Sequence, residues 1–289
     1  MTVRTSELAL HSMDDTMGPI LITTIIGAVL LGMTLMQAFY YFMYPKDILY
    51  LKALVVGLVL ADAIHLCVIT DILYFHLVAK YYDPMTLSHM TWSTQVQALI
   101  TGMSSSLVQL HYALWIWRAS NSKPLLLFTL ASIMVLASCN VAWLIFSSRM
   151  KAVQQTIRIA PLTMTIHSLS AFVDVMNAAS IMVLLRRSQS GLIKSDNLIN
   201  KMILFIVSTG LLTSLCAISL VVSLAAAPTT LISSAFYVLL GKLYVNSFLA
   251  GINARRSFFV RRNDKTNDLQ LFTSVQYELT TYPTVITSS

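Results

Sequence analysis

The stretch from Gly241 to Arg255, Gly-Lys-Leu-Tyr-Val-Asn-Ser-Phe-Leu-Ala-Gly-Ile-Asn-Ala-Arg, forms the end of the last apolar segment of the chain. In a helix that rises 1.5 Å per residue, Lys242 lies about 20 Å from Arg255, deep inside a segment with the length of a membrane span. Desolvating an ammonium group at the centre of a bilayer costs roughly 3 kcal/mol. Lys242 therefore needs a partner on another helix.

The composition of the chain is typical of an integral membrane protein. Of its 289 residues, 56% are hydrophobic and 11% are charged, and the mean hydropathy is +0.73. So few charges cannot cover the surface of a soluble globule. Because a span needs about 20 apolar residues, the apolar runs predict an all-α bundle of seven transmembrane helices at about 18–43, 52–77, 93–117, 124–147, 162–185, 202–226 and 231–251.

The basic residues between these spans predict the orientation. Five Lys or Arg fall on the side of the amino terminus and thirteen on the opposite side. Because cytoplasmic loops carry the excess of Lys and Arg, we expect an extracytoplasmic segment at 1–17, a transmembrane domain at 18–251 and a flexible cytoplasmic tail at 252–289. The net charge of +7 then indicates attraction to the anionic inner leaflet and not nucleic-acid binding.

Three ionisable residues on different predicted helices fall at one depth. Asp62 lies about 15 Å from Lys52 along its helix and Asp174 about 18 Å from Arg186, so both are at the level of Lys242. The pattern predicts that Lys242 pairs with Asp62 or with Asp174. The other carboxylate is then protonated, hydrogen-bonded or bound to a cation.

This buried polar centre is the candidate ligand or ion-pair site. In the sequence its members are Asp62, His65, Asp174, Asn177, Lys242 and Asn246. His65 and Asn246 are candidate hydrogen-bond partners of the second carboxylate. The alternative is a polar staple that holds the helices in one packing arrangement.

Two more specific chemistries are disfavoured. Lys242 has the helix and depth of a retinal Schiff base, but the third helix has no acidic counter-ion and Val238 stands one turn before the lysine. A zinc hydrolase needs several histidines at one level beside a carboxylate. Here His65 and His167 lie toward the outer side and His111 toward the inner side. We therefore expect no enzyme activity, no metal and no cofactor.

Several motifs occur in a fixed order along most of the chain. They are Asp62-x-x-His65, the run 188–191 continued by 195–201, the run 208–214, and the run 242–247 continued by 253–255. In their order and spacing these motifs resemble a large basidiomycete fungal family of seven-helix proteins that is filed as a domain of unknown function. The resemblance implies a polytopic membrane protein and assigns it no activity.

Three functions remain open, of which a receptor-like or sensory protein is favoured. Such a protein uses the polar centre for a small-molecule ligand, and the loop 186–201 and the tail for cytoplasmic partners. A small-solute or proton-coupled transporter uses the buried charges as a relay, but the sequence shows no convincing internal repeat and few prolines within its spans. A structural membrane protein is the third alternative. The lipid bilayer is a partner in every case, and the plasma membrane is favoured over an internal membrane.

Overall fold

The computed structural model describes residues 13–43, 48–80, 91–120, 123–150, 158–187, 193–228 and 230–254. Its elements are α1 (Met13–Phe42), α2 (Leu49–Tyr74) with the π-helical turn η1 (Phe75–Ala79), α3 (Trp92–Ser120), α4 (Lys123–Ser148), α5 (Ala160–Arg187) and α6 (Ile193–Ala226). A last helix follows at Ile232–Ala254. Every regular element of the described ranges is helical, which confirms the predicted all-α class.

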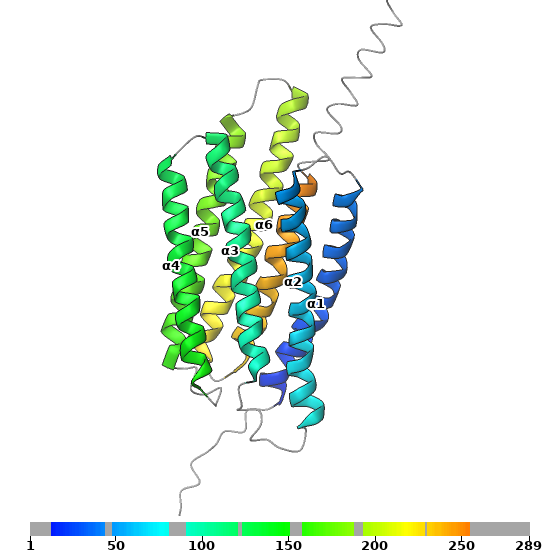
Figure 1. The fold of residues 1–289 in the computed structure, drawn as a ribbon, viewed down its shortest axis with the longest axis vertical. Helices are drawn as coiled ribbons and strands as arrows, with labels where there is room; N and C mark the ends of the chain where they lie inside the picture. Colours follow the sequence, from blue (N-terminus) through cyan, green and yellow to red (C-terminus); the bar gives the residue numbers. More distant parts are fainter. Residues whose placement is uncertain are drawn as a thin grey trace, which may run out of the picture.

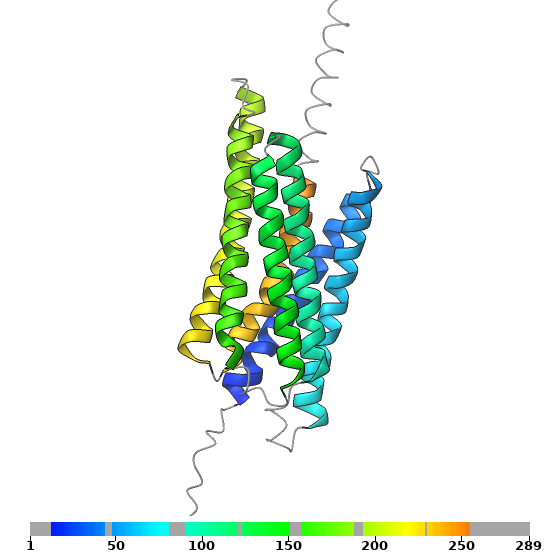
Figure 2. The same ribbon diagram turned by 60° about the vertical axis from the view of Figure 1, so that its left-hand side comes forward.

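The helices lie side by side in one bundle, and helices that follow each other in the chain run in opposite directions (Figure 1 and Figure 2). Six helices of the described chain are long and apolar enough to cross a membrane. They are Met17–Phe42 within α1, Leu49–Ala79 across α2 and η1, Leu126–Ser148 within α4, α5, Val207–Ala226 within α6, and the last helix. The predicted multi-pass membrane architecture is thereby supported at the level of six spans, and α3 is not among them.

The polarity of α3 explains why it differs from the other long helices. It carries Gln97, Thr101, Ser104 and Gln109, and all four side chains are buried. In Figure 1 and Figure 2, α3 runs along the bundle beside α2 and α4. These polar groups therefore point into the protein. They lower the mean hydropathy of α3 without making its outward-facing surface polar.

Some helices begin before their apolar spans. The span Met17–Phe42 agrees with the predicted 18–43, although α1 itself begins at Met13. The sixth span was expected from about 202, whereas α6 begins at Ile193 and its apolar part at Val207. An apolar run shows where a helix enters the hydrocarbon region, but the backbone hydrogen bonds continue into the polar zone. Of the predicted flexible tail at 252–289, residues 252–254 belong to the last helix, and the remainder lies outside the described residues, as do residues 1–12 and residues 188–192 of the basic loop.

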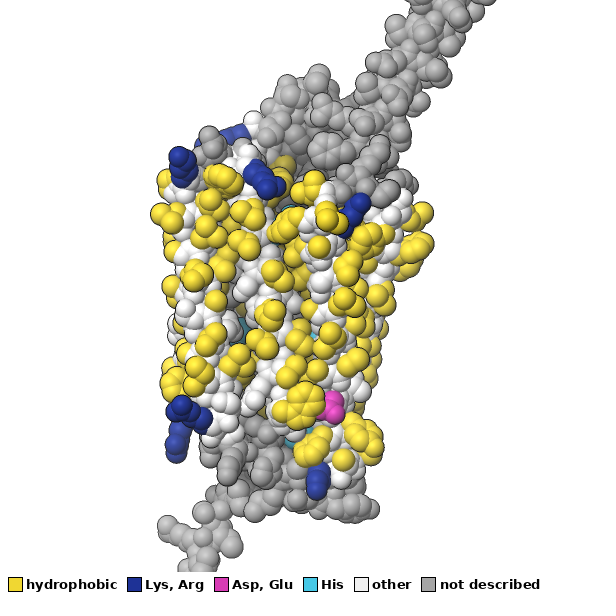
Figure 3. Space-filling view, viewed as in Figure 1, with side chains coloured by type: hydrophobic (Ala, Val, Ile, Leu, Met, Phe, Trp, Pro, Cys, Tyr) yellow, Lys and Arg dark blue, Asp and Glu magenta, His cyan; other side chains and the backbone are white. Residues whose placement is uncertain are grey.

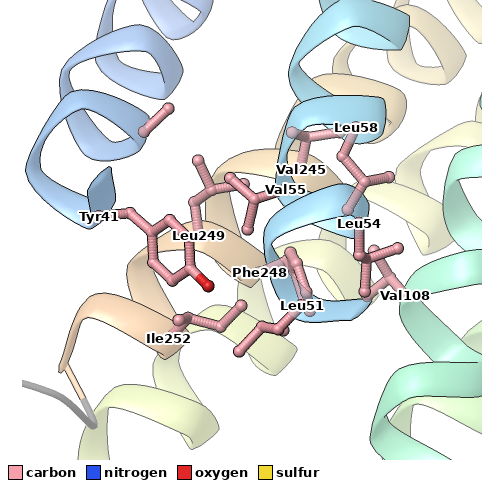
Figure 4. Packing of buried hydrophobic residues seen from close by; sticks show 11 residues of the cluster. Tyr41, Leu51, Leu54, Val55, Leu58, Val108, Val245, Phe248, Leu249 and Ile252 are labelled. Carbon is pink, nitrogen blue, oxygen red and sulfur yellow. The ribbon is translucent and has the colours of Figure 1, made fainter. Parts of the chain in front are cut away.

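The last helix is the central element of the bundle. Within its apolar window 67% of the residues are buried inside the protein, against 11–39% in the other five spans. Figure 4 shows a large part of its packing: Val245, Phe248 and Leu249 of this helix meet Leu54 and Leu58 of α2. The same cluster takes in Ala38 and Tyr41 of α1 and Val108 of α3, so the last helix joins separate parts of the chain.

The outer surface is the counterpart of this core. In Figure 3 hydrophobic side chains cover the middle of the visible face, and Lys and Arg lie near its two ends. α4 is the most exposed span, with 11% of its window buried. Much of α4 therefore faces outward, and the apolar band is consistent with a lipid environment.

Candidate functional site

The last helix presents polar side chains on two faces. Lys242 and Tyr244 are two residues apart, so they point in directions that differ by about 200° around the helix axis. Lys242 contacts α2, whereas the Tyr244 hydroxyl contacts α5. The structure therefore divides the predicted polar centre into two clusters, which we call the ion-pair cluster and the Asp174 cluster.

The ion-pair cluster joins the last helix to α2. Lys242 Nζ lies 2.7 Å from Asp62 Oδ1 and also donates a hydrogen bond of 2.7 Å to the Asp62 backbone carbonyl. The two side chains are 0% and 2% exposed. Of the two partners that the sequence left open, the structure selects Asp62, and it places the pair away from water.

Two glycines let the helices approach this pair closely. A Cβ atom on Gly27 of α1 would lie 3.5 Å from Lys242 Cε, so the lysine stem runs along that glycine. A Cβ atom on Gly241 would lie 3.1 Å from Thr101 Oγ1. His65 Nε2 and Thr101 Oγ1 are 3.1 Å apart, so the histidine bonds α3 and not a carboxylate. Of the alternatives left open for the second carboxylate, a hydrogen bond from His65 is therefore not the one that the structure shows.

Asn246 attaches the last helix to α1. Its Nδ2 donates to the Leu30 carbonyl at 3.0 Å and to Thr34 Oγ1 at 2.8 Å. Further along the same face, Asn253 Nδ2 donates to the Gln37 carbonyl at 2.8 Å. The alternative in which Asn246 binds the second carboxylate is not observed either, because this face of the helix packs on α1.

Removing these amide bonds tests their contribution to stability. Asn246→Leu is expected to lower the free energy of unfolding by about 1 kcal/mol, because hydrogen bonds between membrane helices contribute about 0.6 kcal/mol on average and up to about 1.7. The measurement is unfolding of the detergent-purified protein in increasing sodium dodecyl sulfate. An unchanged midpoint would show that the hydrogen bonds of Asn246 to α1 do not contribute to stability.

The Asp174 cluster lies on the other face of the last helix. Gln109 Nε2 of α3 donates to Asp174 Oδ1 at 2.9 Å and to Ser170 Oγ at 3.2 Å. The Tyr244 hydroxyl donates to Asp174 Oδ2 and lies 3.1 Å from Ser170 Oγ. Asp174 and three other side chains, from α3, α5 and the last helix, thus form one hydrogen-bonded group.

A cavity of about 120 Å³ adjoins this group. Four helices line it: α3 with Val108, His111, Tyr112 and Trp115; α5 with Asp174, Asn177, Ala178 and Ile181; α6 with Thr209, Gly210 and Thr213; and the last helix with Tyr244, Ser247, Phe248, Gly251 and Ile252. It extends from the level of Asp174 toward the end of the bundle where α3, α5 and the last helix end.

Among the described residues, one acidic group of the cavity wall has no counter-ion and one amide group has no hydrogen-bond partner. Asp174 forms no ion pair with any residue of the described ranges. Asn177 is 5% exposed, and its Nδ2 has no hydrogen-bond partner in the same part of the chain. Buried polar groups without partners are uncommon in proteins and cost free energy. The cavity is therefore the place in the described structure where a bound molecule would supply missing interactions.

Sequence reasoning missed the side chains that surround Asp174. Tyr244 stands two residues from Lys242 and was overlooked because it lies on the opposite face. Gln109 was overlooked because it carries no charge. A buried carboxylate needs donors, and that requirement could have directed attention to the polar residues of the same depth.

The described residues contain no group of three or more His, Cys, Asp or Glu that could hold a metal ion. No curated protein and no solved structure matches the chain. The sequence profile of a family described as a family of unknown function, DUF6534, matches residues 170–257, which include Ser170, Asp174, Lys242 and Tyr244.

Proposed function

We propose that the chain is a receptor-like membrane protein that binds a small molecule in the cavity beside Asp174, and that it belongs to the basidiomycete family that its motifs resemble. One observation carries the proposal: four helices line a cavity in which, among the described residues, Asp174 has no counter-ion and Asn177 Nδ2 has no hydrogen-bond partner. Binding pockets typically combine apolar walls with a few polar groups that orient the ligand.

The proposal includes α3 as a seventh span. With 29 residues α3 is about 43 Å long, which exceeds the thickness of a bilayer core. Its buried polar side chains do not oppose insertion, because they meet partners inside the bundle: Gln109 reaches Asp174, and Thr101 reaches His65.

The proposed orientation has the amino terminus outside and the carboxyl terminus in the cytoplasm. Near the end of the bundle to which the cavity extends, the described Lys and Arg side chains are Lys52, Arg118, Lys123, Arg186 and Arg187, and near the other end they are Lys80, Arg149 and Arg158. The positive-inside rule then assigns the cavity to the cytoplasmic half. The ligand would reach it from the cytoplasm or from the lipid.

The ion-pair cluster supports a receptor-like protein over an ion relay. Lys242 and Asp62 are sealed from solvent, and neither lines the cavity. A relay group must exchange protons or ions with water, whereas a dry pair fixes the positions of helices. We therefore assign Lys242 and Asp62 a structural role and place ligand binding at Asp174.

Filling the cavity provides the test. We expect a library of small molecules to contain compounds that raise the melting temperature of the purified protein. Ser247→Phe is expected to abolish those shifts, because the new ring would occupy the cavity, whose volume is about 120 Å³. The matched control is Ser138→Phe on α4, where the serine is exposed. If all shifts persist in Ser247→Phe, the ligands bind elsewhere. If no compound stabilises the protein, a structural role is favoured.

One observation favours a transporter as the second candidate. A smaller cavity of about 30 Å³, lined in part by His167, Ser170 and Tyr237, shares Tyr244 with the larger one. Movement of the Tyr244 hydroxyl would connect the two. Uptake assays with proteoliposomes separate the candidates, because a transporter accumulates the stabilising compounds, whereas a receptor binds them without uptake.

A further inference from the structure

The charge of the cavity wall indicates what kind of molecule fits. Gln109 and Tyr244 are neutral donors, so their hydrogen bonds stabilise a negative charge on Asp174 but do not cancel it. Among the described residues the lining contains no Lys or Arg, and its one histidine, His111, packs edge-to-face against Phe248 at 5.1 Å. The Asp174 side chain is partly buried, and a carboxylate away from water without a countercharge is unfavourable. A cation in the cavity would reduce this cost.

Aromatic rings form much of the remaining wall. Tyr112 and Phe248 meet edge-to-face with ring centroids 6.1 Å apart, and Trp115 and Tyr244 line the same space. The faces of aromatic rings attract cations, and desolvated pairs contribute about 2 kcal/mol. Carboxylate and rings together suit an organic cation, whereas an anion would meet repulsion from both.

Asn177 adds a requirement for an acceptor. It follows Asp174 by three residues on α5, so both side chains lie on the same side of the helix about one turn apart. The unpaired Nδ2 donor of Asn177 would be satisfied by an oxygen of the ligand. The cavity volume of about 120 Å³ is of the order that holds a ligand as small as benzene, which restricts the ligand to a few heavy atoms.

We propose that the cavity binds a small organic cation that carries an oxygen acceptor, with the cationic group between Asp174 and the aromatic rings and the oxygen toward Asn177. This inference rests on the proposed function, because it specifies the ligand class of the same site. It assigns Asp174 the role of counter-ion, separate from the ion pair of Lys242.

Three probes of one shape test the charge preference. Choline is a cation with a hydroxyl group, 3,3-dimethylbutan-1-ol is its neutral carbon isostere, and 3,3-dimethylbutanoate is an anion of similar shape. We expect choline to raise the melting temperature of the purified protein saturably, with an apparent affinity at least tenfold above that of either comparison compound. Asp174→Asn is expected to weaken choline binding at least tenfold, which equals about 1.4 kcal/mol.

Two further variants keep the result interpretable. Asp71→Asn is the matched control, because Asp71 accepts a hydrogen bond from Ser93 at the other end of the bundle and does not line the cavity. It is expected to bind choline as the unaltered protein does. Trp115→Leu removes one ring without changing Asp174 and is expected to weaken choline binding, so it tests the site even if Asp174→Asn is poorly folded.

The outcomes separate the inference from the proposed function. Equal stabilisation by choline and by its neutral isostere, lost for both in Ser247→Phe, would leave the cavity as a ligand site and overturn the cation preference. Choline binding that is unchanged in Asp174→Asn would overturn it as well. If choline has no effect while neutral library compounds bind in the cavity, the inference fails and the proposed function stands. If no compound of any charge binds there, both fail.

Discussion

Lys242→Met is expected to lower the free energy of unfolding by about 3–5 kcal/mol, the cost of breaking a buried ion pair by removing one partner. The change leaves the Asp62 carboxylate enclosed, because this side chain is 2% exposed and its Oδ1 lies 2.7 Å from the ammonium group that is removed. The Asp62 carbonyl loses a hydrogen bond in the same step. Methionine preserves most of the stem that packs beside Gly27, so the effect reports the charge and not lost volume.

The double variant Lys242→Met with Asp62→Leu identifies the partner. Replacing both charges with apolar groups is expected to recover most of the loss, because buried pairs are often neutral or stabilising when replaced as a unit. Combining Lys242→Met with Asp174→Asn is expected to recover nothing. Lys80→Met, at an exposed lysine, should change the stability by less than about 0.5 kcal/mol. If Lys242→Met leaves the free energy of unfolding unchanged, the ion pair of Lys242 and Asp62 does not hold the helices together.

Gly241→Leu is expected to destabilise the protein by about 3 kcal/mol, at the upper end of the usual cost of overpacking. The new Cβ would lie 3.1 Å from Thr101 Oγ1 and 3.5 Å from His65 Cε1, so the last helix must move away from α2 and α3. That movement would also disturb the adjacent Lys242. Unfolding in sodium dodecyl sulfate measures the loss, and circular dichroism checks that the helices persist.

Gly57→Leu on α2 is the matched control for this change. A Cβ atom at Gly57 would meet nothing within 4 Å, so the leucine side chain has room. It is expected to leave the stability unchanged or to raise it by up to about 1 kcal/mol, because leucine favours a helix more than glycine does. If the two leucine substitutions lower the free energy of unfolding equally, the close contact at Gly241 is not important for the packing of the last helix.

The depth of the buried charges could be predicted from the sequence because depth depends on residue count alone. Each residue adds 1.5 Å along a helix, so the positions of Asp62, Asp174 and Lys242 along their spans follow from counting to the nearest basic residue. The rotation of each helix about its axis could not be obtained in this way. Apolar residues surround most positions of these spans, so the periodic pattern that reveals a buried face is weak.

Because the rotation of each helix was unknown, the contacts of Tyr244 and Gln109 with Asp174 could not be predicted. Neither carries a charge, so neither stood out against the apolar background, yet both donate to Asp174. The cavity depends on the relative positions of α3, α5, α6 and the last helix, whose lining residues are spread from Val108 to Ile252. No local pattern encodes a space between such segments.

By itself the sequence determined that the chain is helical, that it has helices long and apolar enough to cross a membrane and that Lys242 needs a buried partner. These properties follow from composition, run length and the cost of desolvating a charge. Only the tertiary structure decided that the partner is Asp62 and that Asp174 belongs to a separate cavity. The reason is geometric: two aspartates at the same depth are equivalent until side-chain packing places one on each side of the last helix.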